Sequence, residues 1–282
     1  MLGLALASVA PAYDLIRNQS ALVKWPNGDI PMQIKMGTTP SLQDGTNYSS
    51  SVQAAMTTWN ASLRNVQFNG TIAAAGAGAD RNGINEIFLA SDVYGEAFEA
   101  NVLAVTLSYM ATSAQPDGTY RRTQSDIIFN NARTWNSYRG NLQSGVVDIR
   151  RVAIHELGHV LGLDHPDESG QSVSAVMNSH ASDIDSTTTD DIQGAQYMYG
   201  VPGTPVAPAN DLFANASAIT LANNTATVTG SSVSAGKESG EPNHASGEAG
   251  GASVWWKWTA TFNGTLEAKT ANTNFDTLLA VY

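Results

Sequence analysis

Apolar and polar residues alternate along the first 200 positions with two different periods. Across 29–36 the apolar side chains fall on every second residue, which is the period of a strand with one buried face. Across 50–63 and 148–161 they recur every three or four residues, the period of an amphipathic helix. Shorter apolar runs bounded by Gly, Asn and Asp predict further strands at 66–68, 84–89, 102–106 and 126–129.

The ends of the helices can also be predicted. Serines near position 50 are candidate caps for the first helix, and Asp148 is the expected N-cap of the second. Gly162 is a natural stop for that second helix. A last helix should begin near Thr189, with acidic residues in its first turn, and end near 198.

The pattern changes after position 200. Prolines recur every third residue between 201 and 210, which favours an extended linker. Beyond the linker only strand patterns occur, at 225–229, 253–261, 264–268 and 277–282. We expect a small, incomplete all-β sandwich there. The predicted parts are a signal-like or disordered segment (1–20), a main domain (21–200), the linker (201–210) and the sandwich (211–282).

Composition narrows the function. Of 282 residues, 42% are hydrophobic and 14% charged, as in a globular protein. The net charge of −11 and the lack of a Lys/Arg cluster argue against a nucleic-acid partner. No run reaches the roughly 20 apolar residues that span a bilayer. Because there is no cysteine, a bound metal must be held by His, Asp or Glu.

The first 12 residues read like the apolar part of a secretion signal that ends in small residues. The positively charged leader of such signals is missing, so we expect a clipped signal and a secreted protein. An apolar first strand or a disordered tag is the alternative.

Residues 155–165, His-Glu-Leu-Gly-His-Val-Leu-Gly-Leu-Asp-His, carry the chemistry. His155 and His159 are four residues apart, so both face one side of the helix and can share a tetrahedral zinc. A turn at Gly162 would bring His165 round as a third ligand. Three imidazoles leave a position for water, as in catalytic zinc sites, and Glu156 can accept a proton from that water. The predicted reaction is amide hydrolysis.

This motif resembles that of the metzincin metallopeptidases, and most of all the matrixins. The segment that ends at Met177 resembles their Met-turn, a tight turn beneath the zinc ligands. Residues 190–200 resemble the final matrixin helix, in which Asp190 and Asp191 would brace that turn. The resemblance covers about 20–200 and implies an α+β fold, with a twisted mixed sheet, an active-site helix and a C-terminal helix.

The chain departs from the matrixin pattern at the ligands of a second, structural zinc and its neighbouring calcium. Val105 and Ile128 stand where matrixins have His, and Asn130 and Arg133 replace acidic ligands. An apolar side chain or a guanidinium cannot ligate a cation. We therefore predict that these two ions are absent. A calcium elsewhere remains open, with candidate ligands Asp80, Asn82, Asp183 and Asp185.

The resemblance also implies where a substrate binds. Residues 102–106 are expected to form a sheet edge on which an extended peptide pairs as an added strand; a plain edge strand is the alternative. A loop after the Met-turn is expected to form the wall of the pocket for the side chain that follows the scissile bond. The candidate substrate-binding residues are Leu103, Ala104, Val105, Asn178, Ser179 and His180. A solvated role is the alternative for His180.

Segments at 210–216, 236–244, 253–259 and 275–282 resemble a β-sandwich of the bacterial pre-peptidase C-terminal type. Trp255, Trp256 and Trp258 could stack on a carbohydrate, although alternation along a strand makes them more typical of core and surface positions.

Together these features predict a secreted bacterial zinc endopeptidase with one catalytic zinc, acting as a monomer on protein or peptide substrates. The alternative is a non-catalytic zinc-containing protein that binds a surface or matrix. Glu156 distinguishes them, because an inactive site need not retain a general base. Zinc-dependent amide hydrolysis of a cell-wall or small-molecule substrate is a third reading, which the predicted edge strand disfavours.

Overall fold

The computed structural model describes residues 13–38, 40–203, 207–244, 247, 250–271 and 277–282. The chain divides into two compact units, Met1–Gly203 and Thr204–Tyr282. The predicted signal-like residues 1–12 lie outside the described residues, as do linker residues 204–206. The boundaries between the four parts expected from the sequence stay predictions.

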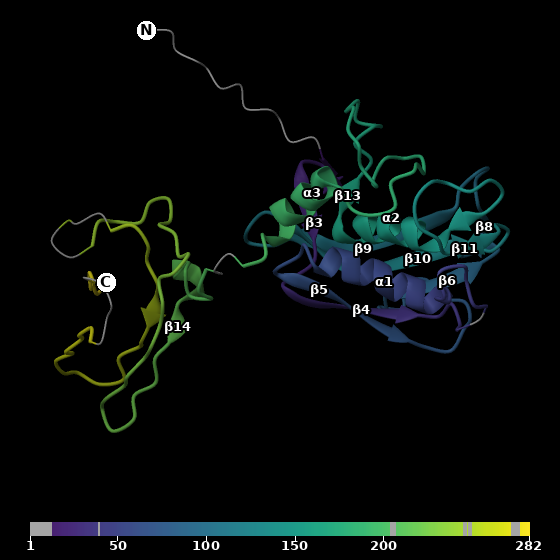
Figure 1. Ribbon diagram of the computed structural model, residues 1–282. Coiled ribbons are helices and arrows are strands. Elements are labelled where there is room, and N and C mark those ends of the chain that lie inside the picture. The colour runs from purple at the N-terminus through teal and green to yellow at the C-terminus, as the bar shows by residue number, and fades with distance from the viewer. Residues whose placement is uncertain (1–12, 39, 204–206, 245–246, 248–249, 272–276) are drawn as a thin grey trace, which may run out of the picture. The chain divides into compact units, whose positions relative to one another are not determined.

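A mixed sheet of seven strands forms the framework of the first unit (Figure 1). Its strand order is β2-β3-β10-β6-β4-β5, and β9 pairs with β10 in antiparallel orientation. The bounds are β2 (Arg17–Asn18), β3 (Ala21–Lys24), β4 (Gly28–Ile34), β5 (Val66–Ile72), β6 (Glu86–Ala90), β9 (Ala104–Ala114) and β10 (Tyr120–Asn130). The strands predicted at 29–36, 66–68, 84–89, 102–106 and 126–129 correspond to β4, β5, β6, β9 and β10.

Three two-stranded pairs in the described part of this unit lie outside the sheet. They are β1 (Asp14–Leu15) with β13 (Leu163–Asp164), β7 (Asp92–Val93) with β8 (Glu96–Ala97), and β11 (Trp135–Asn136) with β12 (Val147–Asp148). Such short strands have no periodicity to detect, so the sequence does not predict them. The sequence also underestimates β9 and β10, because the outer half of β9 is exposed and polar and is held by pairing rather than by burial.

The described residues of the first unit form three α-helices, α1 (Tyr48–Asn60), α2 (Ile149–Leu161) and α3 (Thr189–Tyr199). The expected serine cap of α1 is wrong. Asn47 is the N-cap, and Ser50 completes a capping box with it. The predicted ends of α2 are confirmed: the Asp148 side chain accepts a hydrogen bond from the Arg150 amide, and Gly162 ends the helix with a left-handed φ of 108°.

Helices α1 and α2 pack together against the sheet (Figure 1). On β4 the side chains of Ile30, Met32 and Ile34 are buried, whereas the intervening residues are exposed, so one face of this strand supports the core. Trp59 of α1 is fully buried and donates from Nε1 to the Ile154 carbonyl at 2.8 Å. This contact fixes α1 against the middle of α2.

The C-terminal end of α2 is held by two aromatic side chains. Trp25 donates from Nε1 to the Val160 carbonyl at 2.8 Å, and the Tyr199 hydroxyl donates to the Leu161 carbonyl at 2.6 Å. The last carbonyls of a helix lack intrahelical partners, so these bonds satisfy groups that would otherwise be buried without one. They also fix the point at which the chain turns at Gly162.

The second unit differs from the predicted sandwich. Its described strands are β14 (Ser217–Ala218) and β15 (Trp256–Lys257), which pair in parallel, together with the 3-10 turn Phe213–Asn215. Apolar side chains expected to face a core are exposed, including Leu266 (52%) and Leu279 (44%). Strands without a buried face lose the packing that stabilises them, so the described residues of this unit do not form a sandwich.

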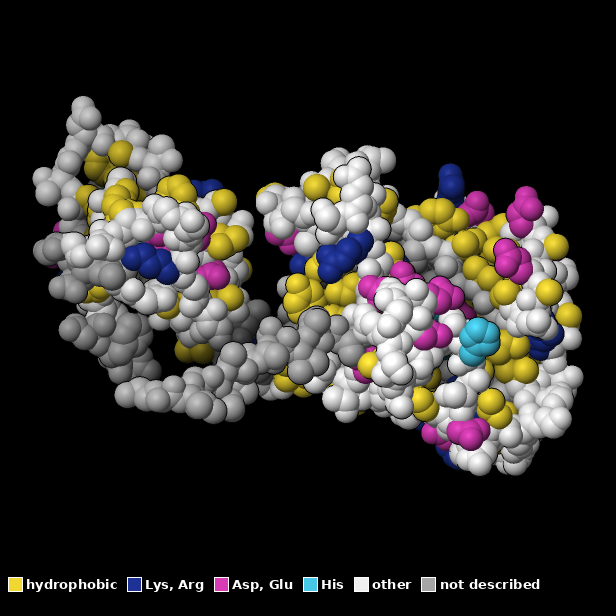
Figure 2. All heavy atoms as spheres, turned by 90° about the horizontal axis from the view of Figure 1, so that it is seen from above, with side chains coloured by type: hydrophobic (Ala, Val, Ile, Leu, Met, Phe, Trp, Pro, Cys, Tyr) yellow, Lys and Arg dark blue, Asp and Glu magenta, His cyan; other side chains and the backbone are white. Residues whose placement is uncertain are grey.

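The sequence argues against a nucleic-acid partner and against a membrane span, and surface charge and helix length are the properties of the fold that relate to these two expectations. On the face shown in Figure 2, Lys and Arg side chains lie apart from one another. Within the described parts of the chain, no helix combines the length and apolar character needed to cross a membrane.

Arg122 of β10 is buried among these elements, with an exposed fraction of 1%. None of its three guanidinium nitrogens has a hydrogen-bond partner among the described residues. Burial lowers its pKa to about 10, which means that the charged form is disfavoured in the folded state. The cost is therefore present at neutral pH and fades only as the pH rises through 10.

We predict that Arg122→Met raises the free energy of unfolding at pH 7 by about 1–4 kcal/mol, because it removes a buried charge and keeps most of the volume. Urea denaturation would measure the change. The exposed neighbour Arg121 provides the matched control, for which Arg121→Met should change stability by less than about 0.5 kcal/mol. Destabilisation by Arg122→Met would mean that the guanidinium makes a favourable interaction.

Candidate metal centre

Three histidines meet at the C-terminal half of α2. His155 and His159 lie on the helix, and His165 follows the turn at Gly162 and the short strand β13. The Nε2 atom of His159 lies 3.0 Å from the Nε2 atoms of both His155 and His165. The Nε2 atoms of His155 and His165 lie 3.2 Å apart. The ring atoms predicted to bind one metal therefore converge on one point.

The other ring nitrogen of each histidine faces an acceptor. Nδ1 of His155 lies 2.8 Å from the Val176 carbonyl, and Nδ1 of His159 lies 2.9 Å from the Leu163 carbonyl. Nδ1 of His165 lies 3.2 Å from a carboxylate oxygen of Glu168. These acceptors favour the tautomer with the proton on Nδ1, which leaves the Nε2 lone pairs free for a metal.

Burial keeps two of these imidazoles neutral. It lowers the pKa of His155 to about 4 and lowers the pKa of His159 well below its usual value. Three bare lone pairs about 3 Å apart repel one another unless a cation lies between them. A tetrahedral zinc with bonds of about 2.0–2.1 Å holds its nitrogens about 3.3 Å apart, so the triad fits this ion.

This triad is the one group of three or more His, Cys, Asp or Glu side chains in the described residues that could hold a metal. The calcium candidates make hydrogen bonds within the protein, and a calcium at them stays an open expectation. Asp183 accepts from the Leu142 amide and Asp185 from the Gly140 amide, both through carboxylate oxygens. Asn82 donates to Glu86, and Asp80 accepts from the Tyr109 hydroxyl.

The residues that replace the matrixin structural-zinc ligands are also engaged within the fold. Val105 pairs with Ile128 across β9 and β10, and Ile128 is fully buried. Asn130 and Arg133 both donate to the Val102 carbonyl. The absence of this second zinc and of its calcium stays a prediction.

Glu156 lies beside the triad with only 5% of its surface exposed. Burial raises the pKa of its carboxyl to about 7, and a hydrogen bond from Thr106 acts in the opposite direction. The Thr106 hydroxyl donates to Oε2 at 2.6 Å. The sequence offers no signal for this contact, because 50 residues separate its partners.

The turn at Met177, predicted to be a Met-turn, lies against the same helix. Met177 is buried, and a Cβ added at Gly158 would lie only 2.2 Å from its sulfur. Asp191 of α3 accepts from the backbone amides of Val176 at 3.0 Å and Met177 at 3.1 Å. It also accepts from the amide and hydroxyl of Thr188 at 2.7 and 2.8 Å. Thus Asp191, rather than the pair expected from the sequence, makes the contacts with the turn.

The candidate substrate-binding residues fall on two segments. Ala104 and Val105 begin β9, with Leu103 just before them, and β9 is an edge of the sheet in the described structure. Ser179 donates from its amide and its hydroxyl to Asp167, and Asn178 donates to the Val173 carbonyl. His180 is exposed, with Nδ1 2.9 Å from the Ser179 hydroxyl.

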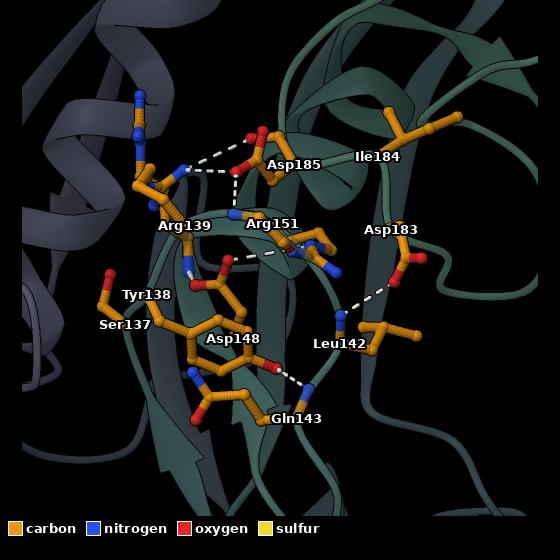
Figure 3. A network of polar contacts seen from close by, with 12 residues as sticks. Ser137, Tyr138, Arg139, Leu142, Gln143, Asp148, Arg151, Asp183, Ile184 and Asp185 are labelled. Carbon is orange, nitrogen blue, oxygen red and sulfur yellow. Dashed lines mark hydrogen bonds and ion pairs between the residues drawn. The ribbon is translucent and has the colours of Figure 1, made fainter.

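The loop after these residues is fixed to the N-terminal half of α2 (Figure 3). Arg151, whose side chain is 3% exposed, donates to the carbonyls of Ser182, at 2.6 Å, and Gly140. Its Nε lies 3.7 Å from the Asp148 carboxylate. Asp183 and Asp185 accept backbone hydrogen bonds from 140–142 in return. Segments 137–143 and 182–185 are therefore held together across the helix.

We predict that Arg151→Met speeds hydrogen exchange at the Gly140 and Leu142 amides by about 10-fold or more, since each lost bond to the guanidinium is worth about 1.5–3 kcal/mol. Mass spectrometry of the deuterated protein would measure this. In the control Arg150→Met the exchange should stay unchanged, because that guanidinium donates to Thr58 on α1. Equal exchange in all three proteins would contradict the prediction.

We predict that Asp191→Ala lowers the free energy of unfolding by about 3 kcal/mol or more, because it leaves buried amides without an acceptor. Asp190 is the matched control. Burial and the Asp191 charge raise the pKa of Asp190, so folding disfavours its ionised form. Thermal unfolding of Asp190→Ala should differ from that of the wild type by at most about 1 kcal/mol. Equal losses in both variants would refute the assignment.

Comparison with known proteins supports the same interpretation. A family model described as matrixin, peptidase M10, matches residues 24–200. Metalloendoproteinase 2-MMP of Arabidopsis thaliana is 37% identical over 57 residues, which are 20% of this chain and 15% of that protein. Matrix metalloproteinase-16 of Rattus norvegicus is 32% identical over 87 residues, which are 31% of this chain and 14% of that protein. Metalloendoproteinase 4-MMP of Arabidopsis thaliana is 29% identical over 105 residues, which are 37% and 30% of the two chains.

These matches span less than a third of each relative, and the family match does not extend into the second unit. The family model nevertheless covers well over half of the 282 residues. The chain belongs to the matrixin family.

Proposed function

We propose that this protein is a zinc-dependent endopeptidase that hydrolyses peptide bonds in extended protein substrates. The observation that carries this proposal is the convergence of three Nε2 atoms beside the buried carboxyl of Glu156, in a chain of the matrixin family. His155, His159 and His165 would hold the metal through these atoms. Zinc held there supplies a Lewis acid that polarises a carbonyl oxygen and makes water more acidic.

Glu156 is the proposed general base and acid. Its carboxylate takes a proton from the attacking water while the water oxygen forms a bond to the carbonyl carbon of the substrate. The C–N bond of the peptide then breaks, and Glu156 returns the proton to the departing amine nitrogen. The buried position of this carboxyl beside the triad favours the peptidase over a non-catalytic binding protein.

The peptide would pair with the free edge of β9. The Leu103 carbonyl accepts from the Asn130 amide at 2.9 Å, so the backbone of Leu103 faces β10. Because backbone groups alternate along a strand, those of Ala104 and Thr106 face away from β10. An added strand can bond to these groups without regard to its side chains. Asn178, Ser179 and His180 are the proposed pocket wall.

The remaining assignments are part of the same proposal. Residues 21–200 form the peptidase domain, 201–210 the linker and 211–282 an accessory unit, and the protein acts outside the cell. Its signal-like first residues support export. A carbohydrate contact through the accessory unit gains little support, because Trp255, Trp256 and Trp258 are all half-buried.

We predict that Glu156→Ala lowers the rate of cleavage of a quenched, unstructured peptide library by about 10²–10⁴ while zinc stays bound, because only the proton acceptor is lost. Chelation of the metal should abolish cleavage, and added zinc should restore it. Glu267→Ala, at an exposed position of the second unit, is the matched control and should cleave like the wild type.

Metal analysis of each protein must accompany the assay. A folded, zinc-loaded wild type that cleaves nothing would favour the surface- or matrix-binding protein. Equal cleavage by wild type and Glu156→Ala would show that Glu156 is not the general base.

A further inference from the structure

We propose that Thr106 is a positioning residue for the general base, and that it couples the strand that pairs with substrate to the carboxylate that moves the proton. This inference rests on the proposed function. The chain places a threonine hydroxyl on β9 in direct contact with the carboxylate of α2, although neither the motif nor the metal requires one.

The contact has a defined direction. A threonine hydroxyl has one proton, and its oxygen lies 2.6 Å from Oε2 of Glu156 and 3.2 Å from the Glu156 backbone carbonyl. The shorter contact identifies Oε2 as the acceptor. No other side chain in the described structure is seen to donate to this carboxylate, so Thr106 holds one oxygen and leaves Oε1 for water.

Such a bond restricts the carboxylate to one orientation. A glutamate side chain has three torsions that can rotate. In the described structure Thr106 is the side chain seen to donate to the Glu156 carboxyl, so this bond restricts those torsions. A hydrogen bond to an ionised acceptor is stronger than a neutral one, which suits it to hold a catalytic group in place. A displacement of 1 Å at a reacting group can lower a rate by about 10²-fold.

The backbone of the same residue lies at the substrate edge. The alternation that begins at Leu103 turns the amide and carbonyl of Thr106 away from β10, toward the open side of β9. A peptide paired there would bond to the main chain of Thr106 while the side chain of Thr106 bonds to Glu156. Thr106 would then position both the substrate and the general base.

The competing explanation is that Thr106 only fills space between β9 and α2. Valine has nearly the same shape but no hydroxyl, and serine keeps the hydroxyl but loses the methyl group. The pair Thr106→Val and Thr106→Ser therefore separates hydrogen bonding from packing.

The first experiment measures kcat and KM of the full chain, loaded with zinc, on one quenched peptide. The expected result for Thr106→Val is a fall in kcat of about 10–100-fold, the equivalent of one hydrogen bond to a charged group. KM and zinc content should stay within about 2-fold, and Thr106→Ser should recover most of the lost rate. Wild-type kcat in Thr106→Val, or no recovery in Thr106→Ser, would overturn the proposal.

The second experiment does not depend on activity. A double-mutant cycle of Thr106→Val and Glu156→Ala, followed by thermal unfolding of the zinc-free full chain, measures the contact itself. We expect the two shifts in Tm to differ from additivity by about 3 °C or more. Additivity within about 1 °C would overturn the contact.

The two experiments separate the failure of the inference from the failure of the proposed function. Cleavage by the wild type with an additive cycle would refute the role of Thr106 and keep the peptidase. A coupled cycle without cleavage by the zinc-loaded wild type would refute the peptidase, and with it the catalytic purpose of the bond.

Discussion

The left-handed turn at Gly162 is the constraint on which the metal centre depends. It ends α2 one turn after His159 and reverses the chain, so that His165 returns to the face that carries His155. A Cβ at this position would lie 3.0 Å from the Val23 carbonyl and 2.9 Å from the Met198 side chain, in addition to the strain of a φ of 108°. The turn therefore needs glycine for both its conformation and its surroundings. The bonds from Trp25 and Tyr199 to the last carbonyls of α2 hold this turn in place.

The parts of the site that could be predicted from the sequence are local. The spacing of His155, Glu156 and His159 along one helix, and the stop at Gly162, follow from residues less than two turns apart. The contact between Thr106 and Glu156 and the bonds from Arg151 to Ser182 and Gly140 could not be predicted. They join segments that the fold brings together, and nothing in the local pattern says which side of a strand faces a helix. The sandwich expected after residue 210 is not confirmed, because alternation along a strand indicates a face to bury but does not supply the surface that covers it.

Buried polar groups of the first unit differ in whether they have hydrogen-bond partners. Around α2 several of them are bonded: Asp191 accepts four hydrogen bonds, and Arg151 bonds to two carbonyls beside Asp148. These contacts restrain the turn at Met177 and hold the loop at 182–185 against the N-terminal half of α2. Arg122 differs from them, since none of its three guanidinium nitrogens has a hydrogen-bond partner among the described residues. Stability is thus lower than it could be at Arg122, whose Nη2 would lie 3.4 Å from a Cβ added at Gly162, beside the turn that ends α2.

The pairing of β1 with β13 has a consequence for folding. Asp14 and Leu15 lie opposite Asp164 and Leu163, and the Ile16 amide donates to the Gly162 carbonyl. The strand that leads into the third histidine is therefore completed by residues almost 150 positions earlier in the chain. Closing so long a loop is entropically costly and is favoured only after other contacts have formed. Helix α2 can form early and bring its two histidines together, but His165 should reach its place in a late step of folding. A partly folded chain would therefore have two of the three metal ligands in position.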